Sequence, residues 1–227
     1  METPAPVPGL LSQLAEALGF ILDLALHVDR YLFPLAETYG FWIYPLLFLV
    51  IFCETGLVIT PFLPGDSLLF AAGALSGAGK LSYPLLLPLI FCAAVAGDQL
   101  NYFAGRHIGQ AAFERERRFL KREYLLRAQA FYTKHGGKAI VLARFVPIIR
   151  TFAPFVAGIA RMRRQSFILF NCCGAAVWVL TLISAGFFLG NLPWVQKNFS
   201  VVIYAIILIS LAPVLVEGLR NRRREKT

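Results

Sequence analysis

Charged residues are scarce in this sequence: Asp, Glu, Lys and Arg make up 15% of the 227 residues, whereas hydrophobic residues make up 58%. Soluble domains average about a quarter charged residues, so the composition excludes an ordinary soluble protein. Apolar stretches of about 20 residues recur, which is the length that a helix needs to cross a bilayer. The composition therefore predicts an all-α integral membrane protein.

Metal-binding and catalytic patterns are also missing. The chain has four cysteines and three histidines. The cysteines lie in apolar segments far from the histidines, which predicts reduced, buried thiols rather than a zinc site. No CxxC, HExxH or glycine-rich phosphate loop followed by lysine occurs. We therefore expect no enzyme activity, no catalytic residue, no cofactor and no metal.

The N-terminal region lacks the basic residues and the cleavage site of a secretory leader, so we expect no cleaved signal. Residues 1–36 are predicted to contain an amphipathic helix over 10–30, which would lie at the membrane interface or against the helical bundle. The membrane domain is expected over residues 37–218, followed by a basic tail over 219–227.

Four apolar stretches are predicted to span the membrane. They are residues 38–56, 82–105, 166–190 and 199–217. Two further apolar segments, residues 57–79 and 138–160, contain residues that interrupt a helix. These are Pro61, Pro64, Gly65, Pro147 and Pro154. Broken helices at membrane depth are tolerated where they face protein or a wet cavity, so we predict two re-entrant hairpins.

Positive charge is concentrated in a few connections, and the formal net charge is +9. Residues 106–134 hold eight Lys or Arg, residues 161–164 hold three, and the tail from residue 220 holds five. The positive-inside rule places these regions and both termini in the cytoplasm. The two hairpins then enter the membrane from opposite sides, which is typical of inverted-repeat transporters.

The basic residues lie beside membrane segments, which favours contact with anionic lipid over nucleic acid. Residues 110–135 are predicted to form a basic amphipathic helix. Two interpretations stay open for this helix: it lies on lipid headgroups, or it is solvated and held by local ion pairs.

Four charged residues lie in or next to the broken segments. Glu54 lies just before the first segment and Asp66 inside it, while Arg144 and Arg150 lie inside the second. Each charge costs roughly 2.5–3.5 kcal/mol in hydrocarbon, which argues against chance retention. If the hairpin tips meet, the carboxylates neutralise the arginines. Asp66 could also cap the half-helix that returns from the first hairpin. The four charges form either a permanent ion-pair clasp or a site that opens for cargo.

The second interpretation predicts a phosphate site. Arginine binds phosphate through a planar fork and stays charged when buried. A phosphate that replaced a carboxylate at Arg144 or Arg150 would free that carboxylate to take up a proton. Asp98, in the next predicted span, is either a further proton carrier or a structural hydrogen-bond partner. Asn171 is expected to bond across helices.

Two pairs of glycines, Gly105 with Gly109 and Gly186 with Gly190, have GxxxG spacing. This spacing favours close helix packing within one chain, with a homodimer contact as the alternative.

Several blocks of this sequence resemble the DedA family of bacterial inner-membrane proteins, also known as the SNARE-associated or VTT-domain family. The resemblance covers roughly residues 35–190. Its strongest blocks are ETGLVITPFLPGDSLLFAAGALSGAGKL, GDQLNYFAGRHIG, KHGGKAIVLARFVPIIRTFAPFVAGIARM and the stretch from Asn171 to Trp178.

This resemblance implies two opposed re-entrant hairpins and an action on membrane lipids. Some members return undecaprenyl phosphate to the cytoplasmic leaflet, relatives in eukaryotes scramble phospholipids, and members in some bacteria depend on the proton motive force. The positions that match the family's functional residues are Glu54, Asp66, Arg144 and Arg150. The resemblance thus predicts a flippase-like or scramblase-like transporter in the bacterial inner membrane that moves a phosphate-headed lipid and supports the cell envelope.

A proton-coupled small-ion antiporter that uses Glu54, Asp66 and Asp98 is the alternative function. Proton-coupled cation flux without lipid movement would distinguish it from the lipid transporter.

Overall fold

The computed structural model describes residues 34, 38, 40–57, 65–114, 131–132, 134–198, 201–202, 204–206 and 208. Within these residues every regular element is a helix, which confirms the predicted fold class at this level. In chain order the elements are η1 (Gly40–Trp42), α3 (Ile43–Gly56), α4 (Gly65–Gly77), α5 (Tyr83–Glu114), α7 (Lys138–Ala143), α8 (Pro147–Ile159), α9 (Arg164–Leu189) and α10 (Pro193–Lys197).

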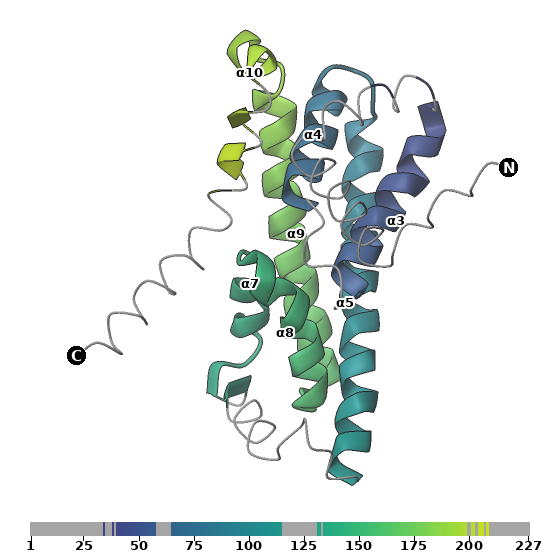
Figure 1. Cartoon of the computed structure of the whole chain (residues 1–227), viewed down its shortest axis with the longest axis vertical. Coiled ribbons are helices and arrows are strands. Elements are labelled where there is room, and N and C mark those ends of the chain that lie inside the picture. Colours follow the sequence, from purple (N-terminus) through teal and green to yellow (C-terminus); the bar gives the residue numbers. More distant parts are fainter. Residues whose placement is uncertain are drawn as a thin grey trace, which may run out of the picture.

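Two long helices, α5 and α9, run side by side along the length of the molecule (Figure 1). Residues 83–108 of α5 and the whole of α9 are long and apolar enough to cross a membrane. At 1.5 Å per residue, each of these 26-residue stretches is about 39 Å long, and a bilayer core is about 30 Å thick. They correspond to the spans predicted over 82–105 and 166–190.

The first predicted span, over 38–56, corresponds to an apolar helical stretch over Gly40–Gly56. Its described residues form the single turn η1 and the 14-residue helix α3. Together they are about 27 Å long, slightly less than the roughly 30 Å of a bilayer core. The last predicted span, the N-terminal helix, Pro61, Pro64 and the basic tail lie wholly or mostly outside the described residues, as does the basic helix beyond Glu114.

The shorter helices form two pairs at opposite ends of the long ones. In Figure 1, α3 and α4 lie beside the upper half of the molecule, and α7 and α8 lie beside the lower half. Helix α3 packs on α5 while α4 packs on α9; in the second pair, α7 packs on α9 while α8 packs on α5. The two halves therefore have the same packing pattern, in which α3 corresponds to α7, α4 to α8 and α5 to α9.

The break between α7 and α8 follows from one proline. Val146 precedes Pro147 and is extended, with φ −116° and ψ 108°, because proline disfavours the helical conformation of the residue before it. Pro147 then starts α8, where its missing N–H costs no helix bond. Pro154, predicted to help break this segment, lies instead inside α8, which continues to Ile159.

The interior has two hydrophobic clusters with polar residues between them. One cluster joins α3, α4, the first half of α5 and the second half of α9. The other joins the second half of α5, α8 and the start of α9. The buried polar residues at the junction include Glu54, Asp98, Asn101, Arg144, Thr151 and Asn171.

Glycines let the helices approach closely. A Cβ atom on Gly186 would collide with the backbone of Phe70 in α4, and one on Gly105 would collide with Phe155 in α8. Gly186 and Gly105 therefore serve packing within the chain, as predicted. The four cysteines are free, as expected, but Cys92 and Cys173 lie exposed on the outer surface of the helices rather than buried.

Gly158→Ala is expected to destabilise the protein by about 1–3 kcal/mol, the usual cost of overpacking. Its new methyl group would lie 2.8 Å from the backbone nitrogen of Arg106 and against the carbonyl of Tyr102. Gly174→Ala is the matched control in α9, because its nearest neighbour would be 3.4 Å away. Thermal unfolding in detergent should show a lower midpoint for the first variant alone; equal midpoints would contradict this account of the α5–α8 contact.

Candidate functional site

Arg150 joins the two acidic residues of the first helix pair. Its Nη1 donates to Asp66 Oδ1 at 2.5 Å, and its Nη2 donates to Glu54 Oε1. Glu54 lies near the end of α3, Asp66 in the first turn of α4, and Arg150 in the first turn of α8. One guanidinium group thus binds carboxylates from two helices, as the fork geometry of arginine permits.

Arg144 has different partners from those predicted. It lies just after α7, and its Nη1 donates to Asp98 Oδ2 and to Asn171 Oδ1, both at 2.7 Å. The prediction that both arginines would pair with Glu54 and Asp66 therefore describes Arg150 alone. Asn171 also donates to the carbonyl of Val95 at 3.4 Å, so it bonds across helices as expected.

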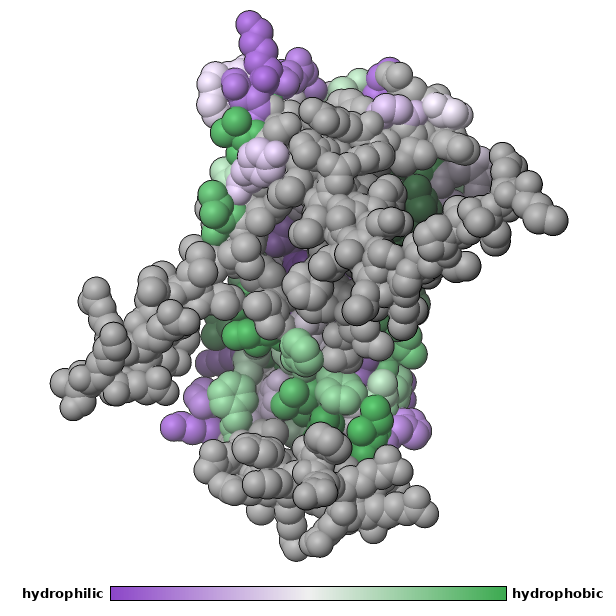
Figure 2. Space-filling view, viewed as in Figure 1, coloured by the Kyte–Doolittle hydropathy of each residue, from purple (hydrophilic) through white to green (hydrophobic). Residues whose placement is uncertain are grey.

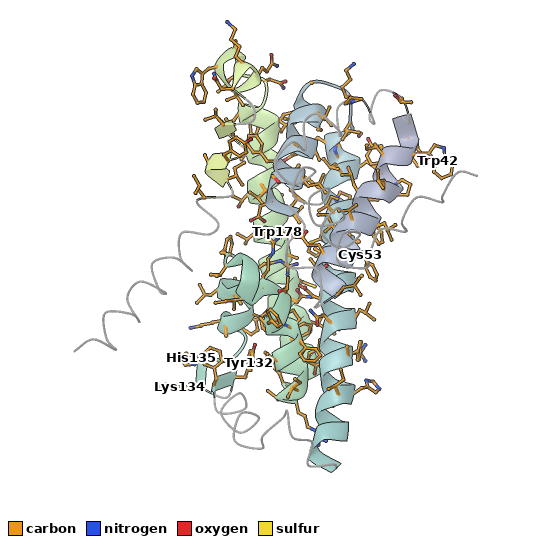
Figure 3. The ribbon with its side chains drawn as sticks, in the orientation of Figure 1. Trp42, Cys53, Tyr132, Lys134, His135 and Trp178 are labelled. Carbon is orange, nitrogen blue, oxygen red and sulfur yellow. The ribbon has the colours of Figure 1, made fainter. Side chains whose placement is uncertain are left out.

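Trp178 connects the two ion-pair groups. Its indole Nε1 donates to Asp66 Oδ1 at 2.9 Å, while the guanidinium carbons of Arg144 and Arg150 lie 5.4 Å and 5.1 Å from the centre of its ring. Both distances are within the range of cation–π attraction. Figure 3 places Trp178 near the middle of the molecule.

Sequence reasoning assigned no role to Trp178. A signal was present, because Asn171 and Trp178 are seven residues apart and therefore share one face of α9. The two side chains present an amide and an aromatic ring to the arginines from that face.

Gly65 allows the carboxylate of Glu54 to approach the start of α4. A Cβ atom at this position would overlap both carboxylate oxygens of Glu54. The N-terminus of a helix carries a partial positive charge, which stabilises a carboxylate placed there. Gly65 therefore contributes to the site by its lack of a side chain, a role more specific than the helix interruption predicted for it.

Asn101 joins helices α3 and α8 at the site. Its side-chain amide donates to the carbonyl of Thr151 in α8 at 2.7 Å and to that of Thr55 in α3 at 3.3 Å. The last carbonyls of a helix lack partners within the helix, so this bond also satisfies the end of α3.

A small cavity lies among these residues. It is lined by Thr55, Asp98, Ile140, Arg144, Arg150, Thr151, Ala153, Pro154 and Trp178, and its volume is about 10 Å³. That space is about what one water molecule requires. A phosphate group does not fit in it, so the structure represents a closed conformation of any phosphate site here.

Some hydrogen-bonding atoms of the charged residues have no partner among the described residues. They are Arg144 Nη2, Arg150 Nε and Glu54 Oε2. Buried donors without a partner are costly, so the two arginines keep capacity for a further acceptor. Within the described part of the chain, no three His, Cys, Asp or Glu side chains lie close enough to share a metal ion.

Comparison with known proteins agrees with the resemblance in the sequence. Residues 63–188 match the VTT domain, and the chain is 48% identical over 207 residues to Protein DedA of Escherichia coli K12, covering 90% of this chain and 94% of that protein. The chain belongs to the DedA family. The matched region contains Asp66, Asp98, Arg144 and Arg150, and the wider match to Protein DedA is long enough to cover most of the membrane domain.

Other DedA-family relatives are named as membrane proteins. An uncharacterized membrane protein of Mycobacterium tuberculosis is 43% identical over 83% of this chain and 84% of its own length. The inner membrane protein YqjA of E. coli K12 is 34% identical over 78% of this chain and 80% of its own length. No solved structure matches the chain. With the apolar helices α5 and α9, these relatives identify the chain as a membrane protein.

Proposed function

We propose that this protein is a transporter that moves a phosphate-headed lipid between the leaflets of the bacterial inner membrane, with Arg144 and Arg150 binding the phosphate. The observation that carries the proposal is the buried Arg144 and the largely buried Arg150 at the junction of the two helix pairs. Each has a buried nitrogen with no hydrogen-bond partner among the described residues. Undecaprenyl phosphate is the cargo that we propose within this class, and we propose transport without enzymatic conversion of the lipid.

The charge of the site supports coupling to protons. Three carboxylates surround two guanidinium groups, which leaves one net negative charge when all five groups are ionised. A phosphate dianion would add two further negative charges in a place where uncompensated charge is expensive. Uptake of two protons by the displaced carboxylates would restore the original charge, so phosphate binding and protonation are expected to occur together.

The arrangement of the helices supports alternating access. The broken helix pairs lie at opposite ends of α5 and α9, and their charged ends meet between the two hydrophobic clusters. We propose that the pairs are the two re-entrant hairpins of an inverted repeat, with four spans and both termini in the cytoplasm. Because the cavity is about 10 Å³, one pair must move away from the other before a headgroup can enter.

A small-ion antiporter is the second candidate, because a cavity of this size accommodates a small ion more readily than a headgroup. Such a protein would use Glu54, Asp66 and Asp98 as proton carriers.

Proteoliposomes distinguish the two functions. We expect a labelled lipid phosphate to change leaflet in vesicles that contain the protein, and to do so faster when a pH gradient is applied. Protein-free vesicles and vesicles with Arg150→Gln should show only background exchange. Proton-coupled cation flux with an unchanged lipid distribution would replace the lipid transporter with the antiporter.

A further inference from the structure

A large apolar groove lies beside the charged site, on the outer side of α7 and α8. Its volume is about 920 Å³, near the upper end of the roughly 300–1,000 Å³ typical of ligand pockets. Most of its lining is apolar and comes from α7, α8 and the segment before α7. The apolar side chains include Leu142, Val146, Ile149, Phe152 and Val156. In Figure 2, a band of apolar residues is visible in the lower part of the molecule, with hydrophilic residues on both sides of it.

A basic pocket of about 490 Å³ adjoins this groove. The two share Tyr132, His135, Gly136 and Lys138. Lys134 lines the groove, and Arg161, Arg163 and Ser166 line the pocket. Among the described residues that line either space, none is acidic. Figure 3 shows Tyr132, Lys134 and His135 together just before α7.

Tyr132 lines the groove and forms a hydrogen bond to a helix that also lines the charged cavity. Its hydroxyl donates to the carbonyl of Ala153 in α8 at 3.0 Å, and burial raises the pKa of Tyr132 to about 12, so the hydroxyl keeps its proton. Ala153 lines both the groove and the cavity that contains Arg144 and Arg150. One wall of the groove is therefore also a wall of the charged cavity.

We infer that the groove and the basic pocket together form a binding site for one phosphate-headed lipid, with the phosphate in the basic pocket and the hydrocarbon chain in the groove. Charge complementarity selects the headgroup, because lysine and arginine gather in the pocket without a carboxylate among its described lining. The apolar groove selects an amphiphile over a soluble anion, which would leave the groove exposed to water.

This site deepens the proposed function: it would be the position where the cargo waits on the basic side before it reaches the arginines. Arg161 and Arg163 lie in the loop between α8 and α9, at the lower end of the molecule in Figure 1. The loop between α4 and α5, which contains Lys80, and helix α10, which ends at Lys197, lie at the upper end. The positive-inside rule then places the waiting lipid in the cytoplasmic leaflet.

Direct lipid binding to the purified full chain in nanodiscs tests the inference, with spin-labelled phosphatidic acid as the probe and phosphatidylcholine with the same chains as the comparison. We expect the phosphatidic acid to be more strongly immobilised. Lys138→Gln/Arg163→Gln, which changes two basic residues of the pocket, should weaken its binding about 30-fold, because each basic residue beside an anionic lipid contributes roughly fivefold. Lys80→Gln/Lys197→Gln removes the same charge from the other end and should leave binding unchanged.

A second variant tests the groove. Val146→Trp should displace the hydrocarbon chain and weaken binding of phosphatidic acid, while binding of inorganic phosphate to the basic pocket persists. Equal binding of the two lipids, or no effect of Lys138→Gln/Arg163→Gln, would overturn the site. If the protein binds phosphatidic acid at this site but transports no lipid, the site is supported and the proposed function is wrong. If the protein transports lipid but none of these variants changes binding, the proposed function is supported and the site is wrong.

Discussion

Replacing Arg150 with alanine is expected to abolish lipid transport and to destabilise the protein by about 3–5 kcal/mol, the usual cost of removing one partner from a buried ion pair. Glu54 is 1% exposed and its side chain forms an ion pair with Arg150, so its charge would lose that compensation. Asp66 would keep the indole of Trp178. Thermal unfolding in detergent and leaflet exchange in proteoliposomes measure the two effects separately.

A matched variant separates stability from transport. Glu54→Gln/Asp66→Asn/Arg150→Ala removes the carboxylate charges together with the guanidinium group, so no buried charge is left unpaired at this position. We expect it to recover much of the lost stability and to remain inactive. Arg150→Lys should also be inactive, because one ammonium group lacks the fork that binds two carboxylates. Transport at the normal rate by either variant would remove Arg150 from the proposed phosphate site.

The convergence of Glu54, Asp66 and Arg150 could be predicted from sequence because charges are rare in apolar segments and must find partners there. The division of partners between the arginines could not. It depends on the break after α7, which places Arg144 outside a helix and Arg150 inside the next one. It also depends on Asp98, which lies on α5 and reaches Arg144 only because α5 and α7 both pack against α9.

The positions of the helices could be predicted where the length of an apolar stretch or a proline determines where a helix begins or ends. The start of α5 and both bounds of α9 follow from long apolar stretches, and the start of α8 follows from Pro147. The end of α5 does not, because the helix continues from the predicted end at residue 105 to Glu114. Pro154 misled the prediction because a proline in an apolar helix does not always end it; neighbouring groups can satisfy the carbonyl that it leaves free. The apolar groove was not predictable, since three separate segments form it.

Asp98→Ala is expected to reduce stability almost as strongly as Arg150→Ala, by about 3–5 kcal/mol, and to abolish acceleration by a pH gradient. Asp98 is 4% exposed, and without it Arg144 keeps the neutral Asn171 and the ring of Trp178 among the described residues. Asp98→Asn keeps the shape and a carbonyl acceptor for Arg144. It should retain more stability than the alanine variant and still respond poorly to the gradient, because an amide cannot take up a proton as a carboxylate does.

The free energies of unfolding of Asp98→Asn, Arg150→Gln and the double variant show whether the two groups of ion pairs act as one cluster. Trp178 contacts Asp66 and both arginines, so the effects of Asp98→Asn and Arg150→Gln should depart from additivity by more than about 0.5 kcal/mol. Replacing Trp178 with leucine in the same set should bring the effects closer to additive. Strict additivity with Trp178 present would mean that the two pairs are independent, and normal gradient dependence in Asp98→Asn would make Asp98 a structural partner of Arg144 alone.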